Sequence, residues 1–244
     1  MRTLLTQVGL CWEFGFGDLW IPYQNHNHGT PIIEWNVKEK GLHPTAKVLR
    51  KGTRRLIMAK KALIVYGTRY GATETTSEEI AKVLQGEGLE VKVVNAKKEK
   101  VKDISPYDLI IVGSGMQMGK WTGEPENFLN QFQKELANKK VAIFVSSAAQ
   151  ALIEHEKKTE EIENNRKQNL EEKAAKYNLQ PISMVTLGGV WDFNKMNFLL
   201  RKTLASFKPR IEAAGFKEIK PGLYDTRDWN VIRNWAKELA VKIA

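Results

Sequence analysis

The sequence has 244 residues, 42% of them hydrophobic and 27% charged, with a formal net charge of +10, and this composition excludes a disordered or fibrous protein. No apolar run approaches the roughly 18 residues that cross a bilayer, and polar residues interrupt residues 1–20, so we expect a cytoplasmic protein without a secretory signal. The single cysteine, Cys11, excludes an intramolecular disulfide and an all-cysteine metal cluster.

Residues 1–57 show no sustained hydrophobic period. We expect either an irregular extension that packs its tryptophans on the main domain, or an upstream stretch that is not translated, with Met58 as the start. Three histidines, His26, His28 and His43, together with Cys11 raise the possibility of zinc or copper, but no spacing matches a closed site. We therefore predict no metal, and we place the main domain at residues 58–244.

The loop after the first predicted strand, residues 62–66, carries small and hydroxylated residues and leads directly into a helix predicted at residues 73–86. Such a turn leaves backbone N–H groups at the positive end of a helix dipole, where an anion binds well. The loop lacks the Lys-Ser/Thr ending of a triphosphate loop and the three spaced glycines of a dinucleotide loop, so it predicts a single phosphomonoester. The candidate phosphate-binding residues are Thr68, Arg69, Tyr70, Gly71, Ala72 and Thr73.

The spacing Tyr66-x-Thr68-x-x-Gly71-x-Thr73 resembles the phosphate-loop signature of the flavodoxins, whose ligand is flavin mononucleotide (FMN). Ser77 stands where that signature has Ala, a difference that affects helix packing more than phosphate contact. The resemblance implies FMN as the cofactor. The alternative is a β–α turn of small residues that binds no ligand.

Apolar strands continue to alternate with helical patterns along residues 58–244. Further strands are predicted at 89–94, 108–113, 140–147 and 182–187, and further helices at 124–138, 150–177 and 229–243. Strands that are apolar on both faces and separated by helices predict a parallel sheet covered on both sides. We therefore expect an α/β fold, a flavodoxin-like three-layer sandwich with a five-stranded parallel sheet of order 2-1-3-4-5.

Ligands of such sheets bind beyond the carboxyl ends of the strands, where the strand order reverses. Small, polar and aromatic residues follow three of the predicted strands, and a flavin ring needs stacking surface and backbone groups. We favour ring stacking for Trp121, whereas core packing and ring stacking are equally good interpretations of Trp191. The candidate ring-binding residues are Ser114, Gly115, Met116, Gln117, Met118, Gly119, Trp121, Ser146, Ser147, Ala148 and Trp191.

Residues 58–244 are similar to the flavodoxin-domain family that includes the menaquinone-dependent protoporphyrinogen IX dehydrogenases. The matching stretches are Tyr107–Gly115, Met118–Trp121 and the ending Tyr224–Trp229. The resemblance implies oxidation of a reduced substrate through FMN, electron delivery to a membrane quinone, and a role in heme biosynthesis. No catalytic side chain is predicted, because the flavin would carry the electrons. Asp228 also predicts an N-cap for the last helix.

Residues 194–220 combine apolar and basic side chains, with only two acidic residues. A basic amphipathic segment suits an anionic membrane surface, where each Lys or Arg contributes ~1 kcal/mol. The alternative is an ordinary surface helix with a solvated basic face. Nucleic acid is not expected, because no recognition motif is present.

Three functional classes follow from these patterns. The first is an FMN-dependent oxidoreductase that passes electrons to a quinone, peripheral to the inner face of the cell membrane. The second is a flavodoxin-type soluble carrier that exchanges electrons with a redox protein partner. The third is an interaction module without flavin.

Overall fold

The computed structural model describes residues 33–34, 47–48 and 59–244. The chain divides into two units, Met1–Ile57 and Met58–Ala244. In the first unit, β1 (Ile33–Glu34) pairs antiparallel with β2 (Lys47–Val48). The rest of the predicted irregular extension, with the histidines and the cysteine considered as metal ligands, lies outside the described residues.

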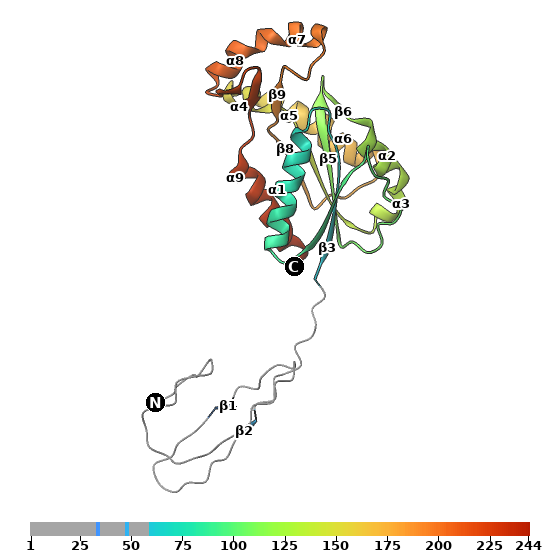
Figure 1. Cartoon of the computed structure of the whole chain (residues 1–244). Coiled ribbons are helices and arrows are strands. Elements are labelled where there is room, and N and C mark those ends of the chain that lie inside the picture. Colours follow the sequence, from blue (N-terminus) through green and yellow to red (C-terminus); the bar gives the residue numbers. More distant parts are fainter. Residues whose placement is uncertain (1–32, 35–46, 49–58) are drawn as a thin grey trace, which may run out of the picture. The chain divides into compact units, whose positions relative to one another are not determined.

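The second unit is built on a parallel sheet (Figure 1). Its strands are β3 (Lys61–Gly67), β4 (Glu90–Asn95), β5 (Leu109–Gln117), β7 (Lys140–Ser146) and β8 (Ser183–Leu187). The spatial order is β4-β3-β5-β7-β8, and every neighbouring pair is parallel. This confirms the predicted order 2-1-3-4-5. A short strand, β6 (Lys120–Trp121), pairs antiparallel with the end of β5.

Helices cover both faces of this sheet, as two-sided apolar strands require. On one face, α1 (Ala72–Gly86) and α9 (Trp229–Ile243) pack on alternate residues of β3, β5 and β7. On the other face lie α2 (Gly123–Gln131), α3 (Gln133–Leu136), the π-helical turn η1 (Lys167–Glu171) and α6 (Glu172–Lys176). The predicted N-cap is confirmed, because the Asp228 carboxylate accepts hydrogen bonds from the N–H groups of Asn230 and Val231.

The single helix predicted over residues 150–177 is wrong. The structure has α4 (Gln150–His155), α5 (Thr159–Arg166), η1 and α6 in its place. Lys157 adopts a positive φ of 54°, which interrupts the helix. The break costs little core packing, since α5 has no buried residue that a continuous helix would hold against the sheet.

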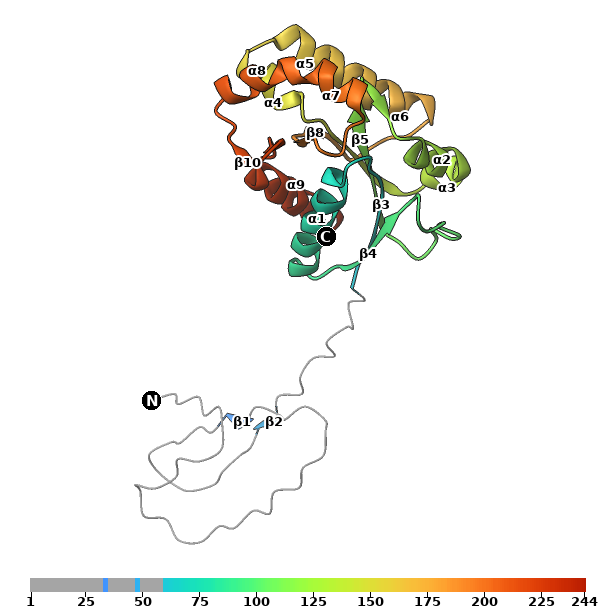
Figure 2. The same cartoon turned by 45° about the horizontal axis from the view of Figure 1, so that its top comes forward.

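Between β8 and α9 the chain forms a smaller layer. An antiparallel sheet has the order β10 (Glu218–Lys220), β11 (Leu223–Asp225), β9 (Val190–Asp192). The helices α7 (Phe198–Leu204), η2 (Ala205–Phe207) and α8 (Lys208–Ala213) connect β9 to β10. Two views place α4, α5, α7 and α8 together at the end of the parallel sheet that carries β6 (Figure 1, Figure 2). Within the described residues, no helix has the length and apolar character of a membrane span.

Candidate functional site

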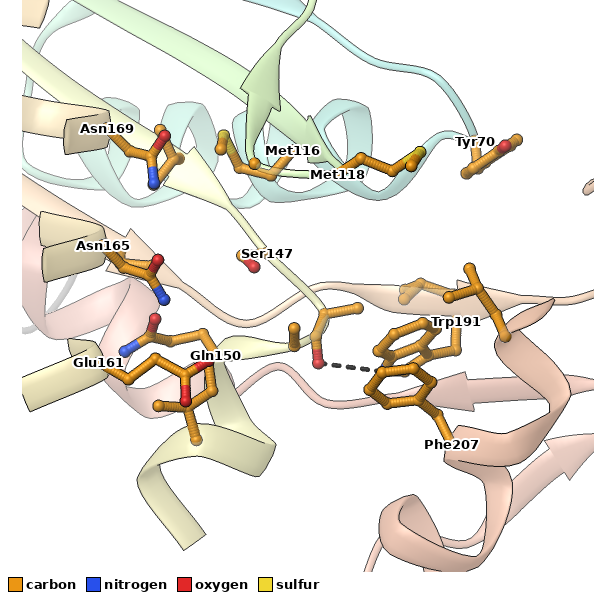
Figure 3. A pocket seen from close by; sticks show the side chains of 18 of the residues that line it. Tyr70, Met116, Met118, Ser147, Gln150, Glu161, Asn165, Asn169, Trp191 and Phe207 are labelled. Carbon is orange, nitrogen blue, oxygen red and sulfur yellow. Dashed lines mark hydrogen bonds between the residues drawn. The ribbon is translucent and has the colours of Figure 1, made fainter. Parts of the chain in front are cut away.

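Three loops converge beyond the carboxyl ends of β3, β5 and β7, on a cavity of about 320 Å³ (Figure 3). This is the end of the sheet where the order of its strands reverses, and where open α/β sheets bind ligands. The predicted residues that line the cavity are Tyr70, Met116, Met118, Gly119, Ser147, Ala148 and Trp191. The structure therefore brings together predicted residues from four separate segments of the sequence.

The predicted phosphate loop runs from the end of β3 into the first turn of α1. Gly71 precedes the helix with a φ of 98°, a left-handed conformation that glycine adopts without strain. Its N–H donates to the hydroxyl oxygen of Thr68 at 2.9 Å, which closes the loop. Ala72 and Thr73 are the first residues of α1, so their N–H groups belong to the turn that has no intrahelical partners. A helix start of this kind favours an anion.

The carboxyl end of β5 lies directly against the first turn of α1. A Cβ atom on Gly115 of β5 would lie 3.0 Å from the hydroxyl oxygen of the buried Thr73. Gly115 therefore permits this close approach, and the cavity is lined by Met116, Met118 and Gly119, which follow it. Gln117 pairs through its backbone with Lys120 of β6.

Two basic side chains that are distant in sequence reach the phosphate loop. Lys195 donates from its amine to the carbonyl oxygen of Tyr70 at 2.9 Å, and it pairs with Asp192 at 3.4 Å. Arg227 donates to the carbonyl oxygen of Ala72 at 3.2 Å. Neither contact has a local sequence signal, because 125 and 155 positions separate the partners.

A second cavity of about 280 Å³ lies on another side of the phosphate loop. Arg69 and Lys97 line it together with Thr68, Tyr70 and the start of α2. Arg69 and Lys97 supply positive charge on this side of the loop, which suits a phosphate group, whereas Lys195 and Arg227 are paired with Asp192 and Asp225.

Trp191 lines the ring cavity and is also part of a small core. Its indole stacks on Phe193 at 6.1 Å and on Phe207 at 5.6 Å between ring centroids, and its N–H donates to the carbonyl oxygen of Ala148 at 3.0 Å. Only 7% of the residue is exposed. Core packing of Trp191 is therefore confirmed, and ring stacking stays a prediction for a residue that also lines the cavity.

Three predicted side chains do not reach the cavity. Ser114 is buried, and its oxygen accepts the N–H of Thr122 at 3.0 Å. The hydroxyl of Ser146 donates to the carbonyl oxygen of Gly188 at 3.0 Å. Ser146 lies between Val145 and Ser147, which line the cavity, so strand alternation turns its side chain to the opposite face. Ser114 shares the face of Met116, but Thr122 at the start of α2 covers its hydroxyl oxygen.

Trp121 is the third of these side chains, and its placement contradicts the predicted stacking role. It is 4% exposed within the core cluster under α2, and its indole N–H donates to the carbonyl oxygen of Asn169 at 3.0 Å. Pairing of β6 with β5 turns this residue inward, an effect that the glycine-flanked loop sequence does not reveal.

Sequence reasoning missed two walls of the cavity. One wall is apolar and comes from α7 and its flanks, and the other is polar and comes from α4, α5 and η1. These residues are Met196, Leu200, Leu204 and Phe207 on the first wall, and Gln150, Glu161, Asn165 and Asn169 on the second. The four-residue spacing of the two asparagines was the available signal, because it places both on one side of a helix.

Thr226 fixes two of the loops to each other. Its hydroxyl donates to the carbonyl oxygen of Gly189 at 3.1 Å and contacts the carbonyl oxygen of Ala148 at 3.3 Å. The Gly189 N–H in turn donates to the Thr226 hydroxyl at 3.2 Å. Thr226, in the stretch Tyr224–Trp229, therefore holds together two loops beside the cavity. The sequence predicted no such role for this stretch.

The donor set fits a ligand with an anionic end and a planar ring. The helix start and the surrounding cations suit a phosphate, and the apolar and aromatic lining beyond Tyr70 suits a heteroaromatic ring. Among the described residues, no group of three or more His, Cys, Asp or Glu could hold a metal ion.

Comparison with known proteins agrees with this geometry. A model of the flavodoxin domain matches residues 63–209, which is more than half of the chain. Among solved structures, the chain is similar to an FMN-bound flavodoxin from Fusobacterium nucleatum, with 15% identity and a TM-score of 0.43 over 76% of this chain and 99% of that one. It is also similar to oxidised flavodoxin 1 from Bacillus cereus, with 17% identity and a TM-score of 0.40 over 63% of this chain and 98% of that one.

A further similarity is to the rubredoxin oxygen:oxidoreductase of Desulfovibrio gigas, with 19% identity and a TM-score of 0.39. The match covers 64% of this chain and 36% of that protein, so it concerns one part of a longer molecule. The family model, the strand order and the phosphate loop agree. The chain belongs to the flavodoxin domain family.

Proposed function

We propose that this protein is an FMN-dependent oxidoreductase that takes electrons from a reduced organic substrate and passes them to a quinone. The observation that carries the proposal is the cavity of about 320 Å³, which begins beside an anion-binding loop and is walled by aromatic and apolar side chains. Membership of the flavodoxin domain family supports the redox role.

The phosphate of FMN would be held by the N–H groups of the loop from Thr68 to Thr73, with positive charge from Arg69 near it, while Lys195 and Arg227 hold the backbone of the loop. The ring would lie in the cavity between Met116 and Met118 on one side and Ser147 and Ala148 on the other. Bound FMN supplies the capacity to accept two electrons and to release them singly or together. The protein supplies position and electrostatics.

The walls of the cavity would control the access of water and of the substrate to the flavin ring. The α7 wall is apolar, and such a wall excludes water from the reacting ring and strengthens electrostatic interactions beside it. It also suits a large hydrophobic reductant. The similarity of residues 107–115, 118–121 and 224–229 to the protoporphyrinogen IX dehydrogenases supports protoporphyrinogen as the substrate and menaquinone as the acceptor, and with them a role in heme biosynthesis.

The outer face of α7 supports contact with an anionic membrane surface at the inner side of the cell membrane. Phe198 and Leu199 are 72% and 74% exposed, and the exposed Arg201 and Lys202 follow them on the same helix. Exposed apolar side chains beside cations suit an anionic bilayer. Since α7 also walls the cavity, a quinone in the membrane would lie close to the flavin.

The first test is the visible spectrum of the purified full chain. We expect a yellow protein, and we expect Thr73→Ala to weaken FMN retention. A colourless protein that takes up no flavin on incubation with FMN would reject both redox functions and leave a flavin-free interaction module.

The second test separates the enzyme from a carrier. For the enzyme, we expect protoporphyrinogen to bleach the bound flavin anaerobically, menaquinone to restore the colour, and the protein to float with anionic liposomes. Bound flavin that no reduced porphyrin bleaches would contradict the proposed substrate.

A soluble electron carrier is the second candidate, and Met118 favours it. This residue is 84% exposed while it also lines the cavity, so a redox protein could approach the flavin at this edge. The carrier would accept electrons from a reductase with a strong salt dependence and would turn over no small molecule.

A further inference from the structure

Two asparagine side chains form the polar end of the ring cavity (Figure 3). Asn165 comes from α5 and Asn169 from η1, one turn further along the chain. Asn169 is only 9% exposed. Within the described part of the chain, neither side-chain amide has a hydrogen-bond partner, although both line the cavity. The residue is largely buried while it lines the cavity, so its amide is available to a ligand that enters the cavity.

The backbone around Asn169 is held firmly. Its carbonyl oxygen accepts the indole N–H of the buried Trp121 at 3.0 Å. The next residue, Leu170, is 1% exposed in the core cluster of that face. The helix is π-helical at this position, a geometry that is frequent at functional sites. The backbone that carries the amide is therefore held before any ligand binds, which reduces the entropic cost of recognition.

The amides at the polar end of the cavity suit a ligand edge that carries both a hydrogen-bond donor and hydrogen-bond acceptors. An amide offers an acceptor and a donor side by side, and the pyrimidine edge of a flavin offers an N–H between two carbonyl oxygens. The hydroxyl of Ser147 lies between the amides and the aromatic end of the cavity (Figure 3). Glu161 lines the same polar end and disfavours an anionic substrate group there.

We propose that Asn169, assisted by Asn165, recognises the pyrimidine edge of the bound flavin. The amide oxygen of Asn169 accepts the N3–H, and its NH₂ group donates to an adjacent ring carbonyl oxygen. This inference rests on the proposed function, because it requires that the cavity binds FMN. The backbone of Ser147 and Ala148, in the loop after β7, would lie near the same pyrimidine edge, and Asn169 would add a side-chain contact to it.

The test compares FMN with N3-methyl-FMN, in which the N3–H is replaced. Dissociation constants are measured by flavin fluorescence for the full chain, for Asn169→Leu and for the control Asn164→Leu, whose residue is exposed on α5. We expect the unmodified protein to bind FMN about tenfold more tightly than N3-methyl-FMN, and Asn169→Leu to bind FMN about tenfold more weakly. In Asn169→Leu the difference between the two ligands should fall below about threefold.

The control Asn164→Leu should behave as the unmodified protein does with both ligands. If Asn169→Leu does not fold, Asn165→Leu at the less buried position replaces it, with a smaller loss in the same direction. Equal binding of both ligands by the unmodified protein, or a full methylation effect retained in Asn169→Leu, overturns the inference while FMN binding stands. A protein that binds neither flavin overturns the proposed function itself.

Discussion

Arg227 reaches back to Ala72, the first residue of α1, and donates to its carbonyl oxygen at 3.2 Å across 155 positions of sequence. The same guanidinium forms a fork with Asp225, with distances of 2.8 Å from Nε and 2.6 Å from Nη2. Its side chain is 8% exposed. The segment after β11 therefore holds the start of the helix that carries the phosphate loop.

Replacing this arginine should weaken phosphate recognition selectively. Arg227→Lys keeps the charge but loses the planar fork, so the start of α1 is held less well. We expect FMN affinity to fall about tenfold and riboflavin affinity to fall much less, because riboflavin has no phosphate. Titration of both flavins measures the ratio.

A matched control for that change is Arg233→Lys, since Arg233 pairs with Glu79 of the same helix away from the loop. This variant should leave the FMN-to-riboflavin ratio unchanged. Equal losses for the two flavins in Arg227→Lys would show that the arginine stabilises the fold without acting on the phosphate.

Gly188 has no room for a side chain. A Cβ atom there would lie 2.2 Å from the carbonyl oxygen of Thr226, which is backbone and cannot rotate away. We expect Gly188→Ala to lower the free energy of unfolding by about 1–3 kcal/mol and to weaken flavin binding, because it separates Thr226 from the loops it fixes. Urea denaturation measures the first effect.

Gly86→Ala is the control for a glycine with open surroundings, since nothing lies within 4 Å of its added Cβ. It ends α1, and alanine should leave the stability equal or raise it by up to about 1 kcal/mol. A Gly188→Ala protein as stable as the unmodified one would contradict the close approach.

Trp121 should behave as a core residue. Trp121→Phe keeps most of the apolar volume but leaves the carbonyl oxygen of Asn169 without its donor, so we expect a loss of about 1–2 kcal/mol in unfolding free energy. FMN binding should persist with at most a modest loss. A large loss of FMN affinity with unchanged stability would support the stacking role and contradict the structure.

Glu126 links α2 to α6 and to Tyr177, which follows α6, and it should make the free energy of unfolding depend on pH. Its carboxylate accepts hydrogen bonds from Lys173 at 2.6 Å, Tyr177 at 3.0 Å and Lys176 at 3.2 Å. Although burial acts to raise the pKa of Glu126, these hydrogen bonds outweigh it and hold the pKa below its ordinary value of 4.5. The folded protein thus binds this proton less readily than the unfolded chain does.

The stabilisation from Glu126 is therefore fully present above the unfolded pKa of about 4.5 and is lost as the pH falls through the lower folded value. We expect Glu126→Gln to cost about 1 kcal/mol at neutral pH and progressively less in acid, as measured by urea denaturation at several pH values. Glu124→Gln, in the same first turn, is the control. A cost that does not change with pH would rule out the ionised carboxylate as its source.

Local patterns in the sequence predicted the parallel sheet, its strand order and the phosphate loop, because two-sided apolar strands and a strand–turn–helix junction are encoded by adjacent residues. The side chain of Ser146 misses the cavity because strand alternation turns it to the other face, and that of Ser114 misses it because Thr122 covers its hydroxyl oxygen. Residues such as Lys195 and Asn169 reach the site through tertiary contacts. No spacing in the sequence connects them to it.

The fork of Asp225 and Arg227 and the hydrogen bonds of Thr226 also have a consequence for biosynthesis. A ribosome synthesises β3 and its loop first, whereas the residues that fix this loop follow β11 and are added much later. The nascent domain therefore emerges with an unfinished flavin pocket. A polypeptide that ends before Asp225 lacks these contacts, and we expect it to bind FMN more weakly than the full chain.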